Sequence, residues 1–153
     1  MRRNDKEIHN PAEIEAIIRR AKVCRLGLCD GIYPYVVPVC FGYEPGVLWI
    51  HSGPGGKKME LITGNPEVSL EFDEVSGTVP AESPCAWGVR YESVIGRGFA
   101  EIVRDSGEKI HGLSCIMRQY SDRETFPFPD HALKGVCVIR IKILEMTGKR
   151  SPP

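Results

Sequence analysis

The sequence has no excess of charge and no long apolar run, and each absence removes a class of function. Its 20 Lys and Arg residues are balanced by 20 Asp and Glu residues, so a protein that holds nucleic acid by bulk electrostatics is not expected. No apolar segment approaches the ~20 residues that a membrane-spanning helix needs. The charged N-terminus carries no hydrophobic signal segment. We therefore expect a cytoplasmic protein that binds neither nucleic acid nor a membrane.

The motifs of several common enzyme and metal-binding classes are also missing. The sequence contains no P-loop, no G-x-G-x-x-G after a strand and no G-x-S-x-G. Its 6 cysteines form no C-x-x-C pair and its 4 histidines lack metal-ligand spacing, so no metal site is expected. In a chain without a secretion signal the thiols stay reduced, and we expect most to be small buried hydrophobic residues. Cys85, in a Pro/Ser-rich loop, is the candidate for a reactive thiol.

The hydrophobic pattern predicts an α+β fold. Helical spacing and capping residues predict helices over residues 11–21, 57–63 and 106–120, the last with its apolar residues at Ile110, Leu113, Met117 and Tyr120. Alternation and turn signals predict strands over residues 23–29, 33–43, 47–52, 67–73, 87–103 and 136–144. Residues 75–84 are predicted as a polar loop and residues 146–153 as a polar tail. We therefore expect one domain, residues 1–153, built as a small antiparallel barrel of six or seven strands with flanking helices.

The most informative stretch runs from Val47 to Leu61. An apolar strand ends on His51 and Ser52, a glycine-rich loop follows, and Lys57 and Lys58 open a helical pattern. A cation in the first turn of a helix is opposed by the helix dipole by roughly 0.3–1 kcal/mol. Free N–H groups at a helix start bind anions, and lysines add positive charge there. The stretch is either a phosphate pocket or a solvated basic turn.

Three further features extend this hypothesis. His51 differs from the other histidines because it ends an apolar strand beside the possible phosphate site. Pro38, inside a predicted strand, removes a ladder donor and frees neighbouring backbone groups for a ligand. Ser93 belongs to a polar group that also contains Tyr91 and Arg97. This group is either a half-exposed bulged strand or a ligand contact, if it lies beside the strand that ends at His51.

These segments, in their order, resemble the FMN-binding split barrels related to pyridoxamine 5′-phosphate oxidase. Within that family they are most similar to the nitroimidazole-resistance branch. The similarity rests on P-Y-V-V-P-V-C-F-G-Y, W-I-H-S-G-P-G-G-K-K, Y-E-S-V-I-G-R-G-F-A-E-I and M-T-G-K. It covers nearly the whole chain. It implies an antiparallel split β-barrel and a homodimer that holds FMN at the subunit interface.

The resemblance implies a role for each segment. The backbone of Val37, Pro38 and Val39 would line the isoalloxazine ring. His51 and Ser52 would lie at the flavin and its ribityl phosphate, and Lys57 and Lys58 would neutralise that phosphate. Ser93 and Val94 would support the cofactor from a neighbouring strand, and Lys149 would reach the partner subunit's site. Of these residues, His51 is the catalytic candidate.

The implied activity is the FMN-dependent reduction of a nitroimidazole or a similar small planar nitro-aromatic compound. Because its ordinary pKa lies near neutrality, His51 can donate a proton or orient the acceptor. The sequence ends at Pro153 without the tryptophan-bearing tail common in that branch. It also lacks the C-terminal Arg/His segment of true pyridoxamine-phosphate oxidases, so vitamin B6 oxidation is not expected. The alternatives are a flavin-binding or flavin-storing protein without turnover, and a pocket for another phosphate-bearing cofactor such as a deazaflavin or haem.

Overall fold

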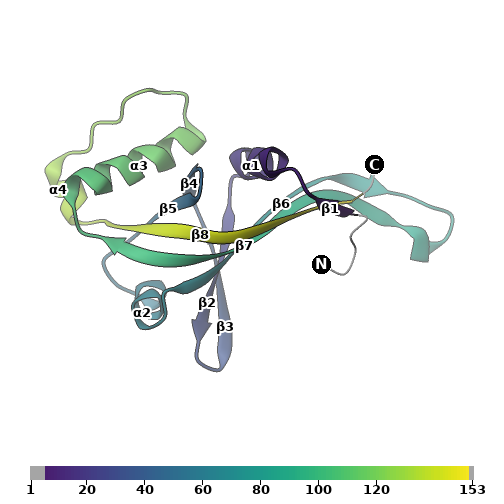
Figure 1. Ribbon diagram of the computed structural model, residues 1–153, viewed down its shortest axis with the longest axis horizontal. Coiled ribbons are helices and arrows are strands. Elements are labelled where there is room, and N and C mark those ends of the chain that lie inside the picture. Colours follow the sequence, from purple (N-terminus) through teal and green to yellow (C-terminus); the bar gives the residue numbers. More distant parts are fainter. Residues whose placement is uncertain (1–5, 152–153) are drawn as a thin grey trace.

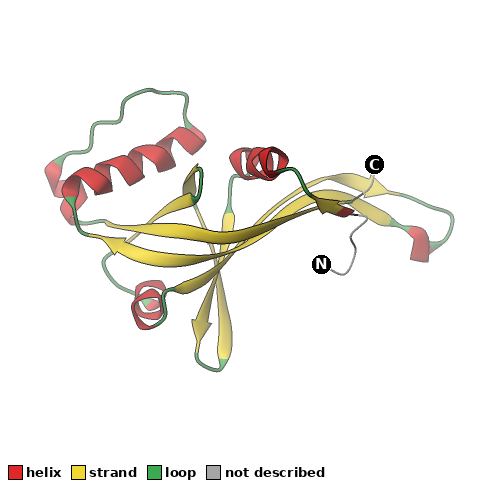
Figure 2. Ribbon diagram, viewed as in Figure 1, coloured by secondary structure: helices red, strands yellow, loops and turns green. Residues whose placement is uncertain are grey.

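The computed structural model describes residues 6–151, which form one antiparallel sheet with helices packed against it (Figures 1 and 2). Its strands are β1 (Glu7–Ile8), β2 (Cys24–Asp30), β3 (Tyr33–Val39), β4 (Phe41–Glu44), β5 (Val47–Ser52), β6 (Glu67–Val79), β7 (Gly88–Val103) and β8 (Cys137–Arg150). Its helices are α1 (Pro11–Arg20), α2 (Lys57–Gly64), α3 (Ser106–Tyr120) and α4 (Asp130–Lys134), with a 3-10 turn at Pro84–Ala86. The helix at Asp130–Lys134 was not predicted.

The order of the strands makes the sheet curl into a split barrel. The order is β3-β2-β6-β7-β8-β5-β4, with β1 paired to β8. Only Cys40 separates β3 from β4 in the chain, yet these strands form opposite edges of the sheet. The sheet must therefore bend until its edges approach each other. Phe41 of β4 and Phe72 of β6 meet across the interior, edge to face, with ring centroids 5.1 Å apart.

The expected fold class is confirmed, with differences in the number and length of the strands. The predicted strand over residues 33–43 is two strands, and β1 brings the sheet to eight strands. β6 continues to Val79 through the predicted loop, and β8 continues to Arg150 through the predicted tail. We call the part of the sheet formed by residues 73–93 and 147–150 the arm (Figure 1). Much of the arm is exposed, so its sequence lacks the apolar alternation that marked the other strands.

Helix α3 packs through a different face from the one predicted. Gly112, Cys115 and Ile116 are buried, whereas the exposed fractions of Ile110 and Met117 are 40% and 38%. The reason is a close approach to β4, because a Cβ atom at Gly42 would lie 2.4 Å from the backbone of Cys115 and Ile116. The helix can therefore dock only where β4 has no side chain.

Most cysteines were expected to be buried, with Cys85 as the exception, and this prediction was wrong for Cys29 and Cys40. Cys24 and Cys115 are buried, and Cys137 is half-buried, but the other three are exposed: Cys29, Cys40 and Cys85. Alternation along a strand predicts which residues share a face, but it does not say which face another element covers. In residues 6–151 no helix is both long enough and apolar enough to cross a membrane.

Candidate functional site

Helix α2 begins directly after the glycine-rich loop, and its N-terminus has no side-chain cap. Gly56, the N-cap residue, has φ = 94°, a conformation that favours glycine. No side chain caps the first turn, and a Cβ atom at Gly53 or Gly55 would meet nothing within 4 Å. The first N–H groups of a helix have no partner within the helix itself. The loop therefore offers open space in front of free backbone donors, which is the geometry of an anion site.

The two lysines that follow have different surroundings. Lys57 forms an ion pair with Asp30 at the end of β2, and its Nζ lies 5.7 Å from the centre of the Tyr35 ring. Hydrogen bonding to Asp30 raises the pKa of Lys57. Lys58 instead donates from Nζ to the backbone oxygen of His51, at 3.3 Å. Partial burial lowers the pKa of Lys58. Within residues 6–151 no carboxylate forms an ion pair with this lysine, so its charge is uncompensated there.

His51 and Ser52 lie at the end of β5, which runs into this loop. They align with Val138 and Cys137 of β8. The His51 side chain is exposed and Ser52 is half-buried. Partial burial, and then the charge of Lys58, lower the pKa of His51. The imidazole is therefore neutral at neutral pH and can both donate and accept a hydrogen bond.

The β3 segment adjoins this group through Tyr35, whose ring lies under Lys57. Val37 is half-buried and Val39 is buried, whereas Pro38 is exposed opposite Arg25 of β2. β3 is an edge strand that pairs only with β2 in the described part of the chain. The backbone groups on its outer side are therefore free to meet a ligand.

Ser93, Val94 and Lys149 lie apart from that group. Ser93 of β7 aligns with Lys149 of β8 and with Asp73 of β6. The Val94 side chain is fully buried in the core, so only its backbone is available to a cofactor. Figure 1 places the C-terminal end of β8 at the opposite end of the molecule from α2. One chain therefore brings together His51, Ser52, Lys57 and Lys58, but it does not bring Ser93 or Lys149 to them.

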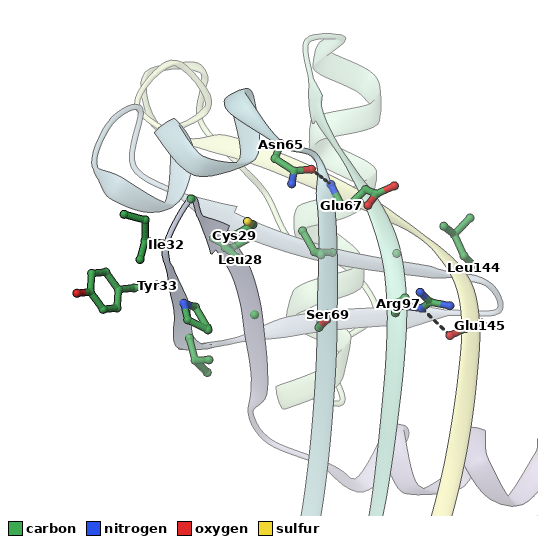
Figure 3. Close-up of a pocket in the computed structure, with 16 residues that line it drawn as sticks. Leu28, Cys29, Ile32, Tyr33, Asn65, Glu67, Ser69, Arg97, Leu144 and Glu145 are labelled. Carbon is green, nitrogen blue, oxygen red and sulfur yellow. Dashed lines mark hydrogen bonds and ion pairs between the residues drawn. The ribbon is translucent and has the colours of Figure 1, made fainter. Parts of the chain in front are cut away.

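A cavity that the sequence analysis missed opens on the outer face of the sheet, between the β2–β3 hairpin and β6, β7 and β8 (Figure 3). Its volume is about 730 Å³. The exposed fractions of Ile32, Tyr33 and Leu144, which line it, are 86%, 74% and 61%. Arg97 of β7 and Glu145 of β8, which are aligned on neighbouring strands, line it as an ion pair, with Nε and Oε1 2.6 Å apart. Exposed apolar side chains around a concave surface are typical of a binding surface. The only sequence signal was Ile32-Tyr33 at a turn.

His111, also outside the predicted site, has a structural role. Its Nε2 lies 3.0 Å from Oε2 of Glu44, and its ring packs edge to face on Trp49 at 5.4 Å. These contacts hold α3 against β4 and β5. No group of three or more metal-ligating side chains occurs among the residues that the structure describes.

Comparison with known proteins gives a consistent family assignment. Residues 10–150 match the family model described as pyridoxamine 5′-phosphate oxidase. A proposed 5-nitroimidazole antibiotic resistance protein from Bacteroides thetaiotaomicron is 38% identical, with a TM-score of 0.83 over 94% of this chain and 86% of that one. A FAD-binding protein from Mesorhizobium loti is 26% identical, with a TM-score of 0.68 over 94% and 96% of the two chains.

A more distant protein shares only the fold. The flavocytochrome Anf3 from Azotobacter vinelandii is 19% identical, with a TM-score of 0.88 over 100% of this chain and 72% of that one. The curated proteins include no match to this sequence.

Proposed function

Because the chain belongs to the pyridoxamine 5′-phosphate oxidase family, we propose that it is a homodimeric FMN-dependent oxidoreductase that reduces nitroimidazoles or similar small planar nitro-aromatic compounds. The observation that carries this proposal is the uncapped start of α2, with the uncompensated charge of Lys58 beside His51. The 38% identity to a proposed nitroimidazole-resistance protein supports the choice of substrate class.

The residues of the loop fit the phosphate of FMN. A phosphomonoester carries a charge of about −1.5 to −2 at neutral pH and offers three acceptor oxygens. The free N–H groups at the start of α2 and the Lys58 ammonium are matching donors. Ser52 would add a hydroxyl from β5, and the free backbone edge of Val37–Val39 would border the ring. The bound flavin would supply the electron-transfer chemistry, and the protein would supply position and electrostatics.

His51 is the proposed catalytic residue. Its side chain is exposed at the end of β5, beside the proposed phosphate site. Since its pKa is lowered, the neutral ring can hydrogen-bond a nitro-aromatic acceptor and orient it. An anion beside Lys58 would offset the ammonium charge and bring the pKa of His51 back toward neutrality. This would let the ring deliver a proton at the reacting nitro oxygen.

The proposed homodimer accounts for two features that a single chain leaves without a partner. Ile32, Tyr33 and Leu144 are exposed around the cavity on the outer face of the sheet. A second copy would cover them, as expected for an apolar surface of this kind. Ser93 and Lys149, which lie far from the loop of their own chain, would then be available to the partner's cofactor.

The test of the proposed activity is oxidation of prereduced, FMN-loaded protein by a nitroimidazole without oxygen, followed by flavin absorbance. We expect wild type to be reoxidised and His51→Ala to react at least about 100-fold more slowly. His131→Ala, an exposed histidine on α4, is the control and should match wild type. A flavin-loaded wild type that is not reoxidised would support flavin binding or storage without turnover instead.

A further inference from the structure

The chain itself supplies an anion to the first lysine of α2. The carboxylate of Asp30 pairs with Nζ of Lys57, although Asp30 belongs to β2 and lies at the turn into β3. The pairing draws the Lys57 ammonium toward the β2–β3 hairpin, where it also lies over the Tyr35 ring. A phosphate at the helix start would therefore meet one free cation, Lys58, and one that is already engaged.

The Asp30–Lys57 pair is weak enough to be exchanged. The exposed fractions of the two side chains are 51% for Lys57 and 32% for Asp30, and exposed ion pairs contribute little to stability. A phosphate dianion has more charge and more acceptor oxygens than a carboxylate. Held by the first-turn N–H groups, it would lie close to Lys57 and would repel the Asp30 carboxylate. Lys57 would then pair either with Asp30 or with the phosphate, but not with both.

We propose that Asp30 is an internal competitor for the cofactor phosphate and sets the affinity of the site by holding Lys57 until the phosphate displaces it. This inference rests on the proposed FMN site. It assigns different tasks to the adjacent lysines: Lys58 is always available to the phosphate, whereas Lys57 changes partner when the phosphate binds. Asp30 thus makes cofactor binding weaker and more reversible than the loop alone would make it.

Asp30→Asn tests the proposal because asparagine keeps the size and turn preference of aspartate but removes its charge. FMN and riboflavin are titrated into each variant and followed by quenching of flavin fluorescence. We expect Asp30→Asn to bind FMN about three-fold more tightly than wild type. Riboflavin, which lacks the phosphate, should bind wild type and Asp30→Asn equally. Glu101→Gln, which breaks the pair with Arg140, is the matched charge control and should leave FMN affinity unchanged.

A double-mutant cycle with Lys57→Ala separates competition from simple repulsion. In the Lys57→Ala background most of the gain in FMN affinity from Asp30→Asn should disappear, because Asp30 no longer has Lys57 to hold away from the phosphate. A gain that persists in full would overturn the competition, since Asp30 would then act by repelling the phosphate directly. Weaker FMN binding by Asp30→Asn would overturn it too, because Asp30 would be positioning Lys57 for the phosphate. A wild type that takes up no flavin would overturn the proposed function itself.

Discussion

At the scale of single residues, adjacent lysines of the same type have separate electrostatic environments. The sequence presents Lys57 and Lys58 as one basic pair, and the hypothesis of a phosphate pocket followed from that pair. In the structure Lys57 is compensated by Asp30, whereas Lys58 donates to the backbone of His51. Asp30 could not be predicted as a partner, because the contact depends on how the β2–β3 hairpin lies against α2.

This difference predicts unequal effects of the two alanine substitutions. Lys58→Ala should weaken FMN binding about ten-fold, because it removes a cation that need not be released from a carboxylate. Lys57→Ala should weaken it only about three-fold, since part of its interaction with phosphate replaces an existing ion pair. Equilibrium titration measures both, with the exposed Lys142→Ala as the control. Equal losses, or a larger loss for Lys57→Ala, would contradict this division.

The lowered pKa of His51 predicts a contribution to pH-dependent stability. Its pKa in the folded protein lies below the ordinary value of 6.5, so the unfolded chain takes up a proton first as the pH falls. Stability should therefore be fully present above about pH 6.5 and decrease as the pH falls from there toward the folded pKa. Urea unfolding of the apoprotein should show a steeper loss over this range for wild type than for His51→Gln. Parallel curves would contradict the prediction.

At the scale of elements, the sequence predicted the strands and helices that have one buried, apolar face. It did not predict the strand segments that lack this apolar alternation. The strand at Val47–Ser52 and the helix over α1 were found as predicted, because alternation and capping mark them locally. The ends of β6 and β8 were missed, since they belong to the arm, where pairing between strands rather than burial holds the chain. The buried face of α3 was missed because it depends on Gly42, a residue far from it in sequence.

The docking of α3 on β4 gives a stability prediction. Gly42→Ala would place a Cβ atom 2.4 Å from the backbone of Cys115 and Ile116, which cannot move without shifting the helix. We expect it to lower the free energy of unfolding by about 2–3 kcal/mol, in the upper range for overpacked sites. Gly64→Ala is the control, because a Cβ atom there meets nothing within 4 Å. Urea denaturation that shows equal stability for Gly42→Ala and wild type would contradict the close approach.

At the scale of the whole molecule, the candidate site is divided between two regions. The loop with His51, Lys57 and Lys58 lies beside α2, and Ser93 and Lys149 lie on the arm, on the other side of the molecule (Figure 1). The order of motifs along the sequence identified the family, which the comparisons confirm. It did not show that the motifs separate in space, because linear order contains no information about which residues of one chain meet. The proposed homodimer is what would reunite them.

Leu144→Asp tests the proposed homodimer. Leu144 lines the cavity on the outer face, and its exposed fraction is 61%. A carboxylate at this place should weaken dimerisation at least about ten-fold, because it would be desolvated between the two copies. Sedimentation equilibrium measures the change, and Ile110→Asp, on the exposed side of α3, serves as the control. A wild type that is monomeric at high concentration would contradict the dimer.

Calorimetric titration of wild-type protein with FMN, FAD and riboflavin tests directly whether the start of α2 holds the phosphate of FMN. We expect one FMN bound for each chain. We also expect riboflavin to bind at least about ten-fold more weakly, because it lacks the group that Lys58 and the helix N–H groups recognise. Equal affinity for FMN and riboflavin, preference for FAD, or no flavin uptake would contradict it.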